Sequence, residues 1–292
     1  MKLGLGTVQF GLDYGIANRG GQTSSDEVAR ILQLAAAHGI RIVDTAALYG
    51  NSETVLGENL QQTSTFDIVT KTAQFTGAEA TADAQQLEQV FHQSLVRLRR
   101  PAVYGLLVHQ ADHLTRPGGA LLMDKMQELK ARGLVRRIGV SVYSAAQIDR
   151  VLDNYAIDLI QVPINVFDQR LLHSGHLRRL QRGGIEVHAR SAFLQGLLLM
   201  TPQSVPEHLS AARKPLESFH RQALERGLSP LQVALGFVAG LEEVDSVICG
   251  VNDHRQLLEL CSAVQTPVAR GDWESFAIDD DLIVNPAEWR SR

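Results

Sequence analysis

Four ionisable side chains stand at, or just past, the C-terminal ends of three successive apolar runs: Asp44, Tyr49, Lys71 and His109. Segments with helical spacing separate these runs, so we expect parallel strands whose C-terminal ends share one face. A carboxyl, a phenol, an amine and an imidazole gathered there suit proton transfer to a polarised oxygen, because each group shifts the pKa of its neighbours.

Apolar runs recur along the whole chain and supply the strands that would position these groups. Eight candidate strands cover residues 2–6, 41–46, 67–72, 105–109, 137–142, 159–165, 185–191 and 246–251. Helical signals follow each run, and no linker rich in glycine or proline divides the chain. These units predict a closed (β/α)8 TIM barrel, a single α/β domain over residues 1–292, in preference to an open doubly wound sheet.

Local signals mark the ends of several predicted helices. Capping boxes are expected at Ser24 with Glu27 and at Ser144 with Gln147, and Ser229 is an expected N-cap before a first-turn proline. Glycines stand where the first, fourth and sixth helices should stop, namely Gly39, Gly133 and Gly183.

The segments outside this pattern concern the mouth of the barrel. An open sheet that binds a dinucleotide would carry a Gly-x-Gly-x-x-Gly turn, a spacing that residues 4–11 do not have. Two irregular stretches, residues 193–213 and 266–292, are expected as a loop and a tail over the mouth. The aromatic residues of the tail either pack on the barrel, which we favour, or line a pocket: Trp273, Phe276 and Trp289.

Composition excludes several classes of function. A net charge of -4, from 28 basic and 32 acidic residues, gives no broad positive field for nucleic acid. Cys249 and Cys261 are too few for a disulfide scaffold and lack metal-ligand spacing, so we expect no metal and a reducing compartment. No run approaches the roughly 20 apolar residues of a membrane span. We therefore expect a cytoplasmic protein that binds neither nucleic acid nor membrane.

The four chemical residues and their surroundings resemble a known family. Asp44-Thr-Ala-Ala-Leu-Tyr49-Gly, followed by Lys71 and His109, is similar to the catalytic tetrad of the aldo-keto reductases. Other matching segments are Gly4-Leu-Gly6-Thr7, Gly139-Val-Ser141 and Gln161-Val-Pro-Ile-Asn165. The resemblance runs from Leu3 to about Ala263. It implies a nicotinamide cofactor across the mouth and hydride transfer between that cofactor and a carbonyl or alcohol.

The side chains themselves suit this reaction. A free phenol has a pKa of about 10, and an adjacent ammonium lowers it. Tyr49 would then be the general acid in reduction and the base in oxidation, with Lys71 as the cation that tunes it. Asp44 would keep Lys71 charged, and His109 would hydrogen-bond the carbonyl oxygen. The structural alternatives are a simple ion pair, a packing tyrosine and a core histidine.

The resemblance also implies contacts to the nicotinamide. Ser141 and Gln161 would contact its carboxamide. The family often has asparagine directly after that serine, where this chain has Val142, so one contact is missing or comes from Asn165. Arg190 stands where the family commonly stacks an aromatic ring, and its planar guanidinium can stack as well. Alternatively, Arg190 binds an acidic group of the substrate.

The adenosine end is expected along residues 248–259, where backbone amides at a helix N-terminus would receive phosphate. The contacts that the resemblance implies are Gly250, Asn252, Gln256 and Glu259. Many NADP-specific members have lysine and arginine here, whereas this segment offers only His254 and Arg255 as positive charges. NADP(H) is expected over NAD(H) by a narrow margin.

Two loops bear on the substrate. Residues 110–118 form a short loop for the family, which should leave an open mouth. The longer first loop, residues 12–23, presents polar side chains near the same mouth, at Asp13, Tyr14, Asn18 and Arg19. This lining fits a polar aldehyde, ketone or sugar-like compound, unless these residues are simply solvated.

Two other functions compete with carbonyl reduction. One is a redox sensor or regulatory barrel that binds the cofactor but has negligible turnover, as potassium-channel β-subunits do. The other is a Schiff-base aldolase with Lys71 as nucleophile, but a neighbouring Asp44 would raise the pKa of that lysine when the reaction needs it lowered. The sequence predicts neither the particular substrate nor the oligomeric state.

Overall fold

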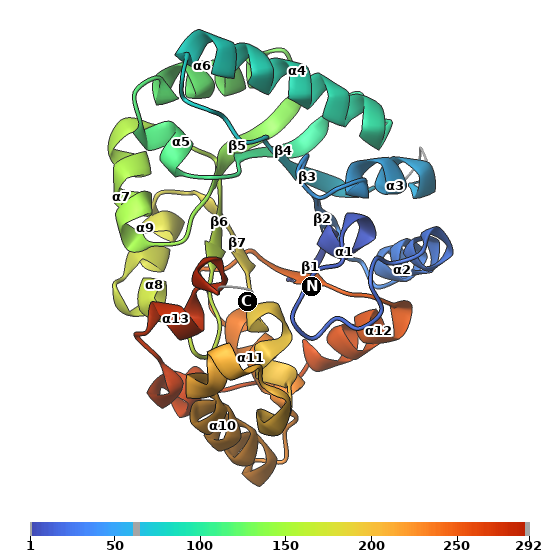
Figure 1. Cartoon of the computed structure of the whole chain (residues 1–292), viewed down its shortest axis with the longest axis vertical. Helices are drawn as coiled ribbons and strands as arrows, with labels where there is room; N and C mark the ends of the chain where they lie inside the picture. Colours follow the sequence, from blue (N-terminus) through green and yellow to red (C-terminus); the bar gives the residue numbers. More distant parts are fainter. Residues whose placement is uncertain (1, 61–64, 290–292) are drawn as a thin grey trace.

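The computed structural model describes residues 2–60 and 65–289 and has a closed barrel of parallel strands at its centre (Figure 1). The strands follow sequence order around the barrel, and β8 pairs with β1 to close it. They are β1 (Leu3–Gly6), β2 (Ile42–Asp44), β3 (Asp67–Lys71), β4 (Val103–Val108), β5 (Val135–Ser141), β6 (Leu159–Pro163), β7 (Glu186–Arg190) and β8 (Ser246–Gly250). Each overlaps one predicted run, so the predicted (β/α)8 barrel is confirmed.

Helices surround the barrel (Figure 1). The longer ones are α2 (Ser25–Ala37), α3 (Ser52–Asn59), α4 (Ala80–Leu98), α6 (Gly119–Ala131), α7 (Ala145–Asn154), α9 (His176–Arg182), α10 (Arg213–Glu225), α11 (Pro230–Ala239) and α12 (His254–Ala263). Four single turns are α1 (Val8–Gly11), α5 (Asp112–Thr115), α8 (Arg170–His173) and α13 (Asp281–Val284). In α2 the residues at helical spacing, Val28, Ile31, Leu32 and Ala35, are the buried ones, as an amphipathic helix on a sheet requires.

The helix ends confirm some of the capping predictions and correct others. Ser229 forms a complete capping box with Gln232 at the start of α11. Ser144 Oγ accepts from the Gln147 amide, but the Gln147 side chain turns to the Tyr143 amide. The predicted box at Ser24 is wrong, because the Ser24 side chain makes no cap hydrogen bond.

The three predicted helix stops are confirmed, although the glycines differ in backbone conformation. Gly39 and Gly133 follow α2 and α6 by two residues, with φ of 72° and 74° in the left-handed region that favours glycine. Gly183 is instead the C-cap of α9, in a right-handed conformation with φ of -75°. The left-handed position there is Gly184, with φ of 68°.

A small apolar layer inside the barrel supports the mouth from below. Val69, Leu107 and Leu159 each precede a candidate site residue by two positions, so they point into the barrel beneath it. They are fully buried and form a cluster of their own. Gly105 leaves room for this layer, because a Cβ there would lie 3.0 Å from Leu159 and 3.1 Å from Val69.

The tail packs against the outer core through its first aromatic residue. Trp273 is 1% exposed and meets the Phe219 ring edge-on at 6.0 Å. Gln169 donates to the Trp273 carbonyl at 2.9 Å. The expected packing of Trp273 is therefore confirmed, whereas the placement of residues 266–292 over the mouth stays a prediction. Among the described residues, no helix is both long and apolar enough to cross a membrane.

Candidate active site

The structure brings the four chemical residues together at the C-terminal mouth of the barrel. Lys71 Nζ lies 2.6 Å from Asp44 Oδ1 and 3.4 Å from the Tyr49 hydroxyl oxygen. Lys71 and Asp44 are 1% and 3% exposed, so solvent screens their attraction little. The Tyr49 ring meets His109 edge-on, with ring centroids 5.8 Å apart. An ion pair therefore touches a phenol, with an imidazole beside that phenol.

Gln161 holds the carboxylate of this cluster from its other side. Its Nε2 donates to Asp44 Oδ2 at 2.8 Å, so each carboxylate oxygen accepts one hydrogen bond from a different strand. The sequence placed Gln161 against the nicotinamide carboxamide, but the structure engages its amide nitrogen with Asp44. Ser141, which pairs with Gln161 across β5 and β6, lines the same pocket.

A tight turn after β2 positions Tyr49. Ser52 anchors this turn to β1, since its hydroxyl donates to the Thr7 carbonyl at 2.8 Å. Gly11 at the end of α1 packs directly on it: a Cβ there would lie 1.9 Å from the Tyr49 carbonyl oxygen. Gly50 follows Tyr49 with φ of 55°, in the left-handed region. Small residues therefore let α1 and the turn approach closely enough to direct the phenol at Lys71.

Burial sets the protonation states of the tyrosine and the lysine. Burial raises the pKa of Tyr49 above 10, and the Lys71 ammonium only partly opposes this effect. The sequence predicted a lowered pKa for this phenol, and that direction is wrong because desolvation outweighs the ammonium. Burial alone would lower the pKa of Lys71, but Asp44 and Tyr49 raise it above its usual value. Both groups therefore carry their protons at neutral pH.

His109 is neutral at physiological pH. Burial, followed by the charges of Lys71 and Arg190, lowers the pKa of His109 from 6.5 to about 3. Its Nδ1 is buried without a hydrogen-bond partner among the described residues. A neutral imidazole carries one N–H, so this side chain can donate a hydrogen bond to a substrate oxygen without exchanging a proton with solvent.

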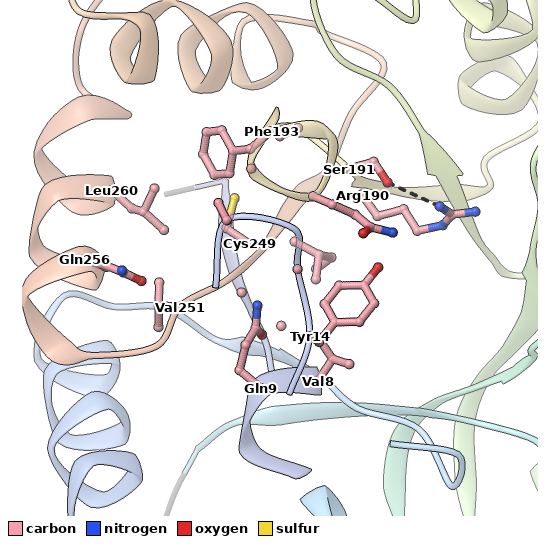
Figure 2. A pocket seen from close by; sticks show the side chains of 18 of the residues that line it. Val8, Gln9, Tyr14, Arg190, Ser191, Phe193, Cys249, Val251, Gln256 and Leu260 are labelled. Atoms are coloured by element: carbon pink, nitrogen blue, oxygen red, sulfur yellow. Dashed lines mark hydrogen bonds between the residues drawn. The ribbon is translucent and has the colours of Figure 1, made fainter. Parts of the chain in front are cut away.

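The cluster lies in a cavity of about 690 Å³ at the mouth of the barrel, which is within the usual size range of ligand sites. Figure 2 shows its walls, with Gln256 and Leu260 of α12 on one side and Arg190 at the end of β7 on the other. Ten of the residues predicted from the sequence line it: Asp44, Tyr49, His109, Ser141, Gln161, Arg190, Gly250, Asn252, Gln256 and Glu259. Lys71 stands behind them, against Asp44 and Tyr49.

Arg190 is held in place by neutral partners. Its guanidinium donates to the Val142 carbonyl at 3.0 Å and to the Ser191 hydroxyl at 3.3 Å. It also lies over the Tyr143 ring, 4.1 Å from the centroid. Asn165, the expected substitute for a carboxamide contact, is fully buried and donates to the Ser191 carbonyl at 3.2 Å. The Asn165 amide therefore serves the loop after β7, which favours the other alternative that the sequence left open, a missing carboxamide contact.

Side chains cap the N-terminal amides of α12, where phosphate was expected. Asp253 Oδ1 accepts from the amides of Arg255 and Gln256 at 2.8 and 2.9 Å. Glu27 accepts from both the amide and the ring of His254. Glu27 is thus engaged with a distant helix, so its side chain does not supply its half of the capping box predicted at Ser24. Two carboxylates therefore surround the expected phosphate site.

The cavity suits a flat, polar cofactor at the junction of β1 and β8. Gln9 Oε1 is a buried acceptor without a partner among the described residues. The Gln9 amide covers Gly250 so closely that a Cβ there would lie 2.4 Å from it. A nicotinamide dinucleotide presents amide and hydroxyl donors that can satisfy such an acceptor. The residues present therefore fit the cofactor that the resemblance implies.

Several pocket residues had no signal in the sequence that marked them as functional. Gln9, Tyr143 and Gln195 line the cavity, but each lies in a loop or a short turn whose path depends on tertiary contacts. Tyr14 and Asn18 of the first loop were expected near the mouth and do line it. Residues 193–199 border the cavity through Phe193, Gln195, Gly196 and Leu199.

Comparison with known proteins agrees with this geometry. Residues 2–277 match the model of the aldo/keto reductase family, so the chain belongs to that family. Aldo-keto reductase AKR2E4 of Bombyx mori is 29% identical over 182 residues, 58% of each chain. Aldo-keto reductase YhdN of Bacillus subtilis (strain 168) is 28% identical over 185 residues, 59% of this chain and 53% of that protein. The matches thus span little more than half of these relatives.

Solved structures of the family share the fold along almost the whole chain. The holo form of aldo-keto reductase AKR11C1 from Bacillus halodurans superposes with a TM-score of 0.79 at 20% identity, covering 99% of this chain and 95% of that one. Glycerol dehydrogenase AKR11B4 from Gluconobacter oxydans gives a TM-score of 0.71 at 20% identity, covering 100% and 94%. At this level of identity the likeness supports the barrel fold.

Proposed function

We propose that this protein is a nicotinamide-dependent oxidoreductase that interconverts a polar aldehyde, ketone or sugar-like carbonyl compound and its alcohol. The observation that carries the proposal is the Lys71 ammonium, bonded at once to Asp44 and to the Tyr49 hydroxyl at the floor of a ligand-sized cavity. Membership of the aldo/keto reductase family supports the same reaction class.

The chain's own groups account for the proton chemistry. A bound reduced nicotinamide supplies the hydride. Tyr49, kept protonated by burial, donates its phenolic proton to the carbonyl oxygen. Lys71 stabilises the phenolate that remains, and Asp44 keeps Lys71 charged. His109 donates a hydrogen bond to the same oxygen and polarises it. In alcohol oxidation the Tyr49 phenolate is the base.

The cofactor contacts are included in the proposal. Ser141 and Gln161 would hold the nicotinamide end, and Gly250, Asn252, Gln256 and Glu259 would hold the adenosine end. Arg190 would either stack on the nicotinamide or bind an acidic group of the substrate. The sequence favours NADP(H) over NAD(H) as the cofactor by a narrow margin. Arg255 at the start of α12 is the side chain best placed to contact a 2′-phosphate, and Asp253 and Glu27 oppose that charge.

The decisive experiment compares wild type with Tyr49→Phe. Stopped-flow oxidation of bound NADPH by a panel of polar aldehydes should slow by about 10²–10⁴-fold in the variant, because its proton donor is gone. Calorimetric affinity for NADPH should stay within a few-fold of wild type. Equal oxidation rates in the two proteins would refute the assignment.

A binding barrel with negligible turnover is the competing function. It predicts that the wild-type protein binds NADPH but leaves it unoxidised by reactive aldehydes over hours. The assembled cluster of Asp44, Tyr49, Lys71 and His109 favours turnover, since a sensor needs no buried ammonium beside its phenol. The aldolase alternative is disfavoured by the raised pKa of Lys71, because a Schiff-base nucleophile must be deprotonated.

A further inference from the structure

One wall of the cavity carries a positive charge that the proton chemistry above does not use. The Arg190 guanidinium has two hydrogen-bond acceptors, a backbone carbonyl and a serine hydroxyl, and neither carries a charge. Within residues 2–60 and 65–289, no carboxylate forms an ion pair with it. A guanidinium keeps its proton at any physiological pH, so this wall is permanently cationic.

Two phenols stand beside this charge. Tyr143 lies under the guanidinium, 4.1 Å from ring centroid to Cζ. Tyr14 comes from the first loop, and Figure 2 shows its hydroxyl turned toward the end of β7. Partial burial, then the nearby Tyr49, raises the pKa of Tyr14 to about 12, so its hydroxyl is a donor at all working pH values. The Gln195 side chain lines the cavity beside this phenol.

The backbone around this wall is strained in a way that fixes its shape. Ser191, Leu194 and Gln195 all have positive φ, at 62°, 50° and 54°. Such conformations cost free energy in non-glycine residues, and strained residues cluster at ligand sites where a fixed geometry is needed. Here the strained segment carries Ser191, which accepts a hydrogen bond from Arg190, and Gln195, which lines the cavity.

The position of this wall points to the substrate and away from the cofactor phosphates. Arg190 lies across the cavity from Gln256 and Leu260, where the adenosine end is expected (Figure 2). Arg190 lines the same cavity as Tyr49 and His109, and its charge opposes the rise in the pKa of Tyr49 and adds to the fall in the pKa of His109. A ligand group bound to Arg190 would therefore share this cavity with a carbonyl that contacts Tyr49.

We propose that Arg190, Tyr14 and Tyr143 form a receptor for an oxyanion, a carboxylate or a phosphate, carried by the carbonyl substrate. This inference rests on the proposed function and narrows its substrate to an anionic aldehyde or ketone. The guanidinium offers planar paired donors that match either oxyanion, and the two phenols add neutral donors. The mouth thus selects by charge, and the cluster around Lys71 performs the proton transfer.

Matched substrate pairs test the receptor. Wild type should prefer succinic semialdehyde over butanal, or glyceraldehyde 3-phosphate over glyceraldehyde, by roughly tenfold or more in kcat/KM. The larger of the two ratios identifies carboxylate or phosphate as the group recognised. Arg190→Gln should reduce that ratio to about one, and Arg190→Lys should retain some of it, since a point charge remains without the planar fork. Tyr14→Phe should reduce the ratio of kcat/KM between charged and neutral substrates by a smaller factor than Arg190→Gln does.

Arg178→Gln is the control, because Arg178 is exposed on α9 and lies outside the cavity lining. It should keep the wild-type ratio. Equal kcat/KM within both wild-type pairs would overturn the receptor. So would an Arg190→Gln variant that slows charged and neutral substrates equally while weakening NADPH binding, since the guanidinium would then serve the cofactor.

A binding measurement keeps this inference separate from the proposed function. Succinate and inorganic phosphate are titrated calorimetrically into protein saturated with NADP+, with succinamide as the neutral probe. The receptor predicts binding of at least one anion to wild type and about tenfold weaker binding to Arg190→Gln. Failure of both anions to bind would sink the receptor even if turnover is found. Anion binding without turnover would support it while the reaction assignment fails.

Discussion

Lys71 Nζ and Asp44 Oδ1 lie 2.6 Å apart, and both side chains are almost completely buried. Their attraction is what keeps an ammonium charged in a place where desolvation alone would neutralise it. The same ammonium touches the Tyr49 hydroxyl, so the ion pair is both a structural element and the support of the proposed acid. These two roles can be separated by mutation.

Removing the ammonium should destabilise the protein. In Lys71→Met the Asp44 carboxylate keeps its charge without its main partner, and breaking a buried pair in this way costs about 3–5 kcal/mol. The double variant Lys71→Met with Asp44→Asn should recover much of that free energy of unfolding, because Gln161 can still donate to the asparagine oxygen. Urea denaturation measures both. A double variant as unstable as the single one would show that the charge is not the cause.

The same lysine should control the pH dependence of alcohol oxidation. The phenolate of Tyr49 is the proposed base in that direction, and burial raises the pKa of Tyr49 above its usual value, so the rate should rise with pH through the alkaline range. Lys71 lowers that pKa, so Lys71→Met should move the rise to still higher pH, while Lys71→Arg should move it less. Initial rates from pH 7 to 11 at saturating alcohol give the profile. An unshifted profile in Lys71→Met would contradict the coupling.

His109 should make the protein sensitive to acid. Its folded pKa of about 3 lies below the unfolded value of 6.5, so between these values the unfolded chain binds a proton here and the folded chain does not. Stability is therefore lost as the pH falls below 6.5. Lowering the pH from 6.5 to 5 should cost wild type roughly 2 kcal/mol more than His109→Gln, at 1.36 kcal/mol per unit.

Urea titrations at both pH values measure this difference. His208→Gln is the matched control, because His208 is exposed on the surface and should leave the acid dependence unchanged. Equal acid sensitivity of wild type and His109→Gln would mean that the imidazole is not kept neutral by burial.

The barrel and the cluster of ionisable residues at its mouth were predictable because they depend on local pattern and on topology. Each apolar run ends in its chemical residue, and parallel strands must bring those ends to one rim. That rule alone was enough to predict that Asp44, Lys71 and His109 lie together at the mouth of the barrel. The direction of the shift in the pKa of Tyr49 was not predictable. It depends on whether the burial of the phenol outweighs the nearby Lys71 ammonium, and spacing along the chain encodes neither quantity.

Contacts between distant segments explain what local sequence pattern could not predict. Glu27 has the spacing of a capping residue, but its carboxylate instead accepts hydrogen bonds from the ring and the backbone amide of His254 in α12. Asn165 has the right type to contact a cofactor but is engaged by the loop after β7. Tyr143 follows β5 and Arg190 ends β7, so their contact depends on tertiary packing that no local motif signals.

The start of α12 should decide between NADH and NADPH. Arg255 is exposed there, and its amide is bonded to Asp253. If a 2′-phosphate binds at this helix, Arg255→Gln should weaken NADPH about tenfold and leave NADH unchanged, because only the phosphate carries the extra charge. Asp253→Asn should tighten NADPH by removing a nearby negative charge. Calorimetry with both cofactors tests this, and parallel changes for NADH and NADPH would place the 2′ position elsewhere.

A hydrogen bond across the mouth should govern how fast the cofactor leaves. Asn252 Nδ2, on the loop after β8, donates to Asn18 Oδ1 on the first loop at 2.6 Å. The first loop also touches the segment after β7, where a Cβ at Gly196 would lie 2.7 Å from Ala17. This loop therefore bridges two sides of the cavity, and a bound dinucleotide must break at least one of these contacts to leave.

Asn18→Ala removes the hydrogen bond without touching the proton-transfer cluster. One net hydrogen bond contributes about 0.5–1.5 kcal/mol, so release of NADP+ should accelerate roughly two- to tenfold. Stopped-flow displacement measures the release rate, and single-turnover oxidation of bound NADPH by a neutral aldehyde should be unchanged, because the side-chain hydrogen bonds of Asn18 involve none of Asp44, Tyr49, Lys71 and His109. Asn59→Ala is the control, since Asn59 lies at the end of α3, away from the mouth. A release rate equal to that of wild type would show that the dinucleotide escapes without opening this bridge.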